Sequence, residues 1–171
     1  MPKCQKKGTL CAMMTASGRP QLDLIVHNIR SAENVGAILR TADCVGARRL
    51  WITGYSPTPE HAKVKKTALG AEGMVEWIQR TDVHEVLGEL RQDSYRIVGL
   101  EITPDAKSLT GYATPERTAL LLGSEVGGLT PSLLAQCDDV VCIPQHGKKE
   151  SLNVSVATGI ASFWLLNASS V

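Results

Sequence analysis

The residues best suited to chemistry lie near the carboxyl end of the chain, in the segment IPQHGKKESLNVSVATGIASFWLL at positions 143–166. Ser151 and Asn153 stand at the start of a stretch whose helical faces are all apolar, which predicts a helix buried on every side. The free N–H donors of a first helical turn can hold a polar or anionic group. The pattern predicts a ligand site, and plain capping with Ser151 as the N-cap is the alternative.

A second polar cluster, SAENVGAILR at positions 31–40, follows an apolar run. Asn34 can cap a helix, and Arg40 comes four residues after Gly36, whose missing side chain leaves room for a ligand beside the guanidinium. The alternative is a surface arginine paired with Asp43 at i,i+3 spacing.

A third cluster, GSEVGGL at positions 123–129, follows another apolar run and carries Glu125 among three glycines. Glycines let the backbone approach a ligand closely or adopt positive φ, although an ordinary turn with an exposed carboxylate has the same composition. The loop contains neither G-x-G-x-x-G nor G-K-[ST], which excludes a dinucleotide fingerprint and a P-loop.

The elements that must position these clusters alternate along the chain. Short runs that are apolar on both faces predict strands, and apolar spacing of three and four predicts helices. This alternation is typical of an α/β fold with a mostly parallel sheet sandwiched by helices, in which ligands bind at the carboxyl ends of strands. The predicted strands are 22–28, 48–55, 74–79, 96–102, 118–124 and 139–144, and the predicted helices before the last are 34–46, 61–71, 82–93 with Asp82 as cap, and 130–137 with Thr130 as cap and Pro131 first.

Length and composition indicate one globular domain, with residues 1–20 as an N-terminal arm that lacks a clear period. The chain has 171 residues and a net charge of +1, so an RNA partner would be held by local basic groups rather than by a global field. Its five cysteines form no C-x-x-C pair, which fits a reducing cytoplasm, and its four scattered histidines suggest no metal site. No apolar run approaches membrane-spanning length.

Taken together and in order, the three clusters resemble the three motifs of the SpoU/TrmH family of RNA ribose 2′-O-methyltransferases, in the SPOUT class. The matching segments are NVGAILRTAD (34–43), LLLGSEVGGL (120–129) and IPQHGKKESLNVSVA (143–157), with ALGAEG (68–73) between them. The resemblance covers about residues 22–167. It implies a single SPOUT domain over residues 21–171, a deep C-terminal trefoil knot and a homodimer with the final helix in the interface. It also implies transfer of the methyl group of S-adenosylmethionine to a ribose 2′-hydroxyl of tRNA or rRNA.

The resemblance also assigns roles to positions. It implies that the catalytic residues are Arg40, Asn34, Glu125, Ser151 and Asn153, and that the cofactor is held around Leu122, Gly123, Ile143, Gly147 and Leu152. Basic side chains suited to RNA include Arg30, Lys148 and Lys149. Val126 departs from the family pattern, in which many members have glycine after the glutamate, and this leaves the geometry of the loop open.

The reaction needs a ribose hydroxyl to lose its proton while it attacks a methyl group on sulfonium. Because a guanidinium is almost always protonated, we expect Arg40 to fix a phosphate and stabilise the developing alkoxide while phosphate or water takes the proton. Glu125 would orient Arg40 or a backbone donor. The alternatives are a non-catalytic RNA-binding module of the same fold and an unrelated doubly wound nucleotide-binding domain. For the last helix, small residues favour a dimer, and burial within one monomer is the alternative.

Overall fold

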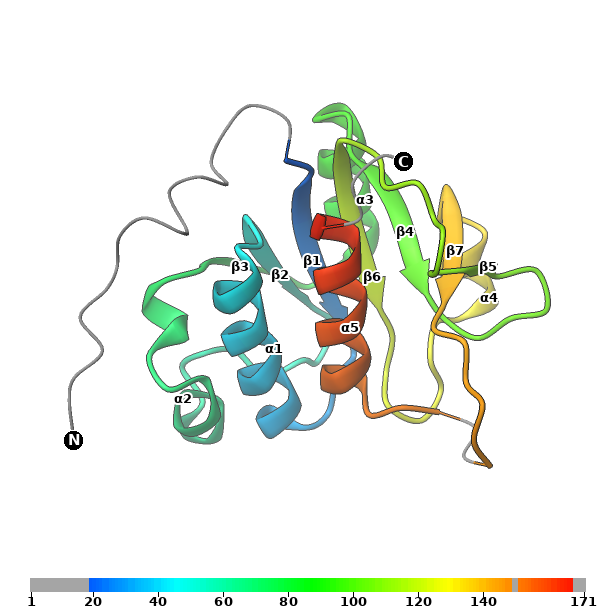
Figure 1. Cartoon of the computed structure of the whole chain (residues 1–171). Coiled ribbons are helices and arrows are strands. Elements are labelled where there is room, and N and C mark those ends of the chain that lie inside the picture. Colours follow the sequence, from blue (N-terminus) through cyan, green and yellow to red (C-terminus); the bar gives the residue numbers. More distant parts are fainter. Residues whose placement is uncertain (1–18, 149–150, 168–171) are drawn as a thin grey trace, which may run out of the picture.

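The computed structural model describes residues 19–148 and 151–167, and within them seven strands form one sheet (Figure 1). The strand order is β3-β2-β1-β6-β4-β7-β5, and every paired strand is parallel. The predicted α/β fold with a parallel sheet is therefore confirmed. The strands are β1 Gln21–His27, β2 Arg49–Thr53, β3 Glu76–Arg80, β4 Arg96–Leu100, β5 Lys107–Ser108, β6 Arg117–Leu122 and β7 Asp139–Cys142.

Helices cover both faces of the sheet, with α1, α2 and α5 on one side and α3 and α4 on the other (Figure 1). Their bounds are α1 Ala32–Val45, α2 Ala62–Ala68, α3 Val83–Gln92, α4 Pro131–Leu134 and α5 Val154–Asn167, with a short 3-10 turn at Ala71–Gly73. The predicted caps of α3 and α4, Asp82 and Thr130, are confirmed, as is Pro131 at the first position of α4. The two-residue strand β5 and the separate 3-10 turn are not apparent from the pattern.

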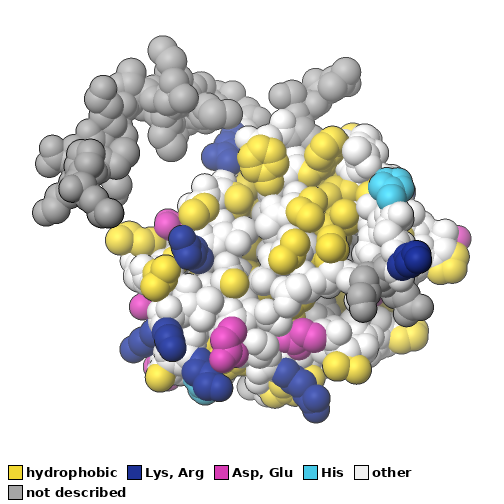
Figure 2. All heavy atoms as spheres, turned by 60° about the horizontal axis from the view of Figure 1, so that its bottom comes forward, with side chains coloured by type: hydrophobic (Ala, Val, Ile, Leu, Met, Phe, Trp, Pro, Cys, Tyr) yellow, Lys and Arg dark blue, Asp and Glu magenta, His cyan; other side chains and the backbone are white. Residues whose placement is uncertain are grey.

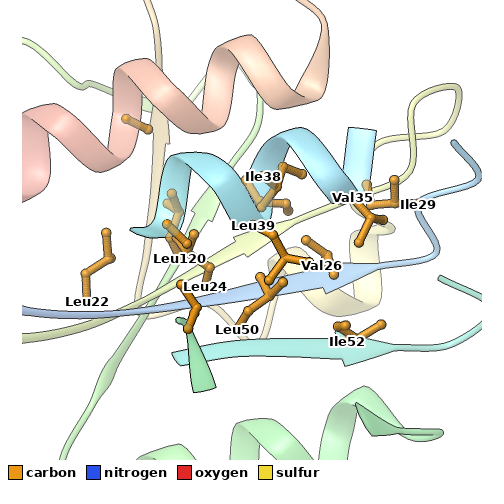
Figure 3. Packing of buried hydrophobic residues seen from close by; sticks show 14 of the residues in the cluster. Leu22, Leu24, Val26, Ile29, Val35, Ile38, Leu39, Leu50, Ile52 and Leu120 are labelled. Atoms are coloured by element: carbon orange, nitrogen blue, oxygen red, sulfur yellow. The ribbon is translucent and has the colours of Figure 1, made fainter. Parts of the chain in front are cut away.

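Two hydrophobic cores follow from the alternation of side chains along β1. Leu24 and Val26 face the core beneath α1 and α5, whereas Ile25 between them faces the core beneath α3. Figure 3 shows the first core, where β1, β2 and β6 meet the apolar stripe of α1. These strands are buried on both faces, which explains why they read as continuous apolar runs.

Helix α1 begins earlier than the pattern predicts, and Ser31 rather than Asn34 is its N-cap. The Ser31 hydroxyl accepts a hydrogen bond from the Asn34 backbone N–H at 3.1 Å, which places Asn34 inside the first turn. Gly36 leaves no room for a ligand, because a Cβ there would lie 2.6 Å from the Val64 carbonyl oxygen. The glycine instead lets α1 and α2 pack closely.

Helix α5 is wrongly predicted as buried on every side. Its inner face is buried, but Val156 is 51% exposed, Ile160 42% and Phe163 62% in the single chain. Figure 2 shows hydrophobic side chains gathered in the upper middle of the face that carries α5. Burial wholly within one monomer is therefore excluded for this helix. No helix of the described ranges is both long and apolar enough to span a membrane.

Candidate active site at the carboxyl edge of the sheet

A cleft of about 380 Å³ opens where β4, β6 and β7 end and α5 begins. It is the position at which open parallel sheets bind ligands. Seven of the residues predicted for the site line this cleft: Leu122, Gly123, Glu125, Ile143, Ser151, Leu152 and Asn153. The three predicted clusters thus meet at one place, although the cluster at positions 31–40 reaches the cleft through hydrogen bonds rather than by lining it.

The floor of the cleft is a tight glycine turn. Ser124 and Gly128 exchange two backbone hydrogen bonds of 3.2 and 3.0 Å, and Gly128 has a φ of 59° that favours glycine. A Cβ on Gly123 would lie 2.2 Å from the carbonyl carbon of Gly128, so only glycine fits there. The departure at Val126 is tolerated because this side chain is 88% exposed.

Glu125 ties this turn to the start of α1. Its carboxylate accepts hydrogen bonds from the backbone N–H groups of Arg30 (2.9 Å) and Ser31 (3.0 Å) and from Asn34 Nδ2 (2.9 Å). Partial burial raises the pKa of Glu125, but these hydrogen bonds outweigh it and leave the pKa below its ordinary value. The carboxylate therefore stays ionised, and it orients backbone donors rather than Arg40.

Asn34 and Asn153 complete a chain of hydrogen bonds across the site. Asn153 Nδ2 donates to Asn34 Oδ1 at 3.1 Å, while Asn153 Oδ1 accepts from the Ser155 backbone N–H at 2.9 Å. Asn153 is therefore the N-cap of α5, and the predicted cap Ser151 instead lies before the helix, exposed at the cleft. The hydrogen-bonded side chains of Glu125, Asn34 and Asn153 thus link all three motifs.

Arg40 does not line the cleft. It is exposed on α1, about 9 Å further along the helix than Asn34 and on a different face. Within residues 19–148 and 151–167 its guanidinium makes no hydrogen bond or ion pair, so the alternative pairing with Asp43 is not formed.

The remaining predicted positions lie around the cleft rather than in it. Gly147 and Lys148 are exposed on the loop between β7 and α5, and neither lines the cleft. The side chain of Arg30 is exposed, although its backbone N–H binds Glu125. Lys149 lies outside the described residues.

Sequence reasoning missed Glu101, which also lines the cleft. Its carboxylate accepts hydrogen bonds from the backbone N–H groups of Leu129 (2.8 Å) and Ile102 (3.0 Å), and it lies against Gly128. Its position directly after β4 is the signal that could have revealed it. The other lining residues that were not predicted are Leu100, Ile102, Ser124, Val126, Gly128, Cys142, Gln145, Val154 and Ala157.

Comparison with known proteins finds relatives among RNA-modifying enzymes. Residues 21–163 match the model of the SpoU rRNA Methylase family. The chain is 35% identical over 145 residues to the 23S rRNA (guanosine-2′-O-)-methyltransferase RlmB of Salmonella typhi; the match covers 85% of this chain and 59% of that protein.

Solved structures share the fold. A protein of the TrmH family from Porphyromonas gingivalis superimposes with a TM-score of 0.79 at 31% identity, covering 89% of this chain and 61% of that one. The TrmH/SpoU tRNA modifying enzyme of A. aeolicus superimposes with a TM-score of 0.76 at 26% identity, covering 86% and 76%. Together with the three motifs gathered around one cleft, the match over residues 21–163 shows that the chain belongs to the SpoU rRNA methylase family.

Proposed function

We propose that the chain transfers the methyl group of S-adenosylmethionine to a ribose 2′-hydroxyl of tRNA or rRNA. The observation that carries this proposal is the hydrogen-bond network of Glu125, Asn34 and Asn153, which joins the three motifs around one cleft. The name of the Salmonella relative supports the ribose 2′-oxygen as the acceptor.

The residues of the cleft fit such a cofactor. Leu122, Ile143 and Leu152 supply apolar walls for an adenine ring, and the turn at Gly123 brings backbone groups to its edge. Two carboxylates, Glu101 and Glu125, also line the cleft and suit a cationic ligand. The cofactor supplies an electrophilic methyl group on sulfonium. Gly147 stays a prediction, because it lies in the adjoining loop.

The acceptor hydroxyl must be held in line with that methyl group. We assign this positioning to Ser151 and Asn153 at the cleft, with Asn34 and Glu125 holding Asn153 and the turn in place. Arg40 would bind the RNA phosphate and stabilise the developing alkoxide, while phosphate or water takes the proton. Because Arg40 lies along α1 away from the cleft, either the RNA spans both places or a second copy brings its cleft to this arginine.

A homodimer through α5 follows from its exposed apolar face. Val156, Ile160 and Phe163 form a stripe that water would otherwise cover, and burying it against a second copy is favourable. The stripe lies beside α1, since Gly159 on α5 faces Thr41. A dimer through this stripe would therefore set the partner chain close to Arg40.

The wider organisation follows the same proposal. We infer a single SPOUT domain over residues 21–171 with an N-terminal arm over residues 1–20, a deep trefoil knot, a cytoplasmic location, and RNA contacts by Arg30, Lys148 and Lys149. The chain spans 59% of the length of the Salmonella relative. The RNA named for that relative is therefore not assigned to this chain, and an experiment must identify its substrate.

The test is methyl transfer. We expect labelled S-adenosylmethionine and RNA lacking modifications to give a 2′-O-methylated nucleoside after digestion, and Arg40→Ala to abolish it. Arg40→Lys should also be weak, because lysine cannot make the planar bidentate contact. Mixing Arg40→Ala with Ser151→Ala restores part of the activity if the site spans two subunits. RNA binding without transfer in the unaltered protein would instead favour a non-catalytic module.

A further inference from the structure

Tyr55 is an exposed aromatic side chain at the same edge of the sheet as the cleft. It follows β2, is 60% exposed, and its phenol hydroxyl makes no hydrogen bond among the described residues. Exposed aromatic rings are one of the ways in which proteins bind unpaired bases, because every base has a face that stacks. The question is whether this ring is held for such a purpose.

A partly buried hydrogen-bond network fixes the turn that presents Tyr55. The Tyr55 backbone N–H donates to Asn28 Oδ1 at 3.3 Å, which turns the Asn28 amide nitrogen toward His27 Nε2 at 3.0 Å. His27 Nε2 is then the acceptor, so Nδ1 carries the proton and donates to Thr53 Oγ1 at 2.9 Å. Burial lowers the pKa of His27, which agrees with this neutral form.

The backbone at this turn is also unusual. Asn28 has a φ of 57°, and Gly54 has a φ of 64° with no room for a Cβ, which would lie 1.9 Å from Asn28 Oδ1. Ser56, buried behind the turn, accepts from the Ile29 backbone N–H at 3.0 Å. Ordering a side chain costs free energy on binding, so a rigid turn that holds an exposed ring favours association.

The same segment runs directly into the proposed active site. Asn28 and Ile29 hold the Tyr55 turn, and the next two residues, Arg30 and Ser31, donate their backbone N–H groups to Glu125. β2 lies two strands from β6 in the sheet, so the strands that lead into the Tyr55 turn and into the cleft turn are about 10 Å apart.

Positive charge accompanies the ring. The exposed side chain of Arg30 directly follows Asn28 and Ile29, which bond the Tyr55 turn. α2 presents the exposed side chains of Lys63, Lys65 and Lys66 at this end of the molecule. Figure 2 shows Lys and Arg side chains gathered along the lower left of this face. Of these lysines, Lys63 pairs with Glu33 at 3.6 Å. An aromatic ring with basic neighbours matches a single-stranded nucleic acid.

We propose that Tyr55 is the stacking platform for an unpaired base close to the target ribose, with Arg30 binding a neighbouring phosphate. This assignment rests on the proposed function, because it presumes an RNA in the site. It makes the substrate a loop or another single-stranded region, since a base inside a duplex cannot reach the ring.

The experiment compares two fluorescein-labelled RNAs of equal length, a hairpin with an unpaired loop and a fully paired duplex, by fluorescence anisotropy. The variants are Tyr55→Ala, Tyr55→Phe and the control Met74→Ala, which truncates another exposed side chain (73% exposed). We expect Tyr55→Ala to bind the hairpin about 5- to 150-fold more weakly, and Tyr55→Phe and Met74→Ala to stay within about twofold of the unaltered protein. Affinity for S-adenosylhomocysteine should not change.

Three results would overturn the stacking role: normal hairpin binding by Tyr55→Ala, equal losses for hairpin and duplex, or no binding of the hairpin by the unaltered protein. If Tyr55→Ala binds the hairpin normally but the unaltered protein still transfers methyl groups, only the stacking role is refuted and the proposed function stands. Conversely, an unaltered protein that neither binds cofactor nor methylates RNA contradicts the proposed function, whatever the Tyr55 variants do.

Discussion

Two glycines of the cleft turn, Gly123 and Gly127, provide a matched pair of substitutions. A Cβ on Gly123 would meet backbone atoms only, at 2.2 and 2.3 Å from Gly128 C and O and 2.5 Å from Leu129 N. Backbone cannot swing aside as a side chain can, so Gly123→Ala must displace the turn, and we expect it to cost about 2–3 kcal/mol of unfolding free energy. A Cβ on Gly127 would meet only Ser124 Oγ, at 3.4 Å.

For a chain of this size, that loss lowers Tm by about 4–12 °C. Gly127→Ala should leave stability unchanged or raise it by up to about 1 kcal/mol, because alanine restricts the unfolded chain. Thermal unfolding followed by circular dichroism measures the stability of both variants. Calorimetric titration measures their affinity for S-adenosylmethionine. We expect affinity to fall at least tenfold in Gly123→Ala alone. If both variants unfold and bind alike, the close packing of Gly123 does not shape the cleft.

Further predictions concern the cap, a histidine and the exposed helix face. Asn153→Ala should lower the unfolding free energy by about 1 kcal/mol and abolish methylation, whereas Asn153→Asp keeps the cap but loses the donor to Asn34, so stability should survive and methylation should not. Burial lowers the pKa of His27 from 6.5, so its contribution to stability is complete above that pH and is lost as pH falls through the lower folded value. Urea unfolding at a series of pH values should show this decline, and a His27→Gln variant that keeps the same decline would contradict it. Phe163→Glu should give a monomer by sedimentation at unchanged fold, and a persistent dimer would place the interface elsewhere.

Local sequence signals predicted which elements form better than they predicted the residue at which each element begins. Thr130 and Asp82 are correct caps because capping depends on the next three residues alone. The start of α1 was misplaced because Ser31 and Asn34 are both capping types, and the run of large apolar residues begins only at Val35, although Ala32 is already buried. Periodicity marks the buried face of a helix, not its first turn.

Roles that depend on distant segments could not be predicted in the same way. The partners of Glu125 lie 91–95 positions away, and the purpose of Gly36 depends on where α2 packs. Glu101 was missed because the predicted strand was drawn through residue 102, which hid its place at a strand end. Exposure of Phe163 was missed because composition alone does not show that a helix lies on the outer layer.

The three hydrogen bonds to Glu125 have a thermodynamic consequence. The carboxylate belongs to the cleft turn, and two of its donors belong to the segment that bonds the Tyr55 turn, so these hydrogen bonds connect the two proposed binding regions. A ligand that orders one of these regions lowers the entropic cost of ordering the other. By linkage, the factor by which cofactor changes RNA affinity equals the factor by which RNA changes cofactor affinity. Loss of the Glu125 carboxylate would then leave two sites that fill independently.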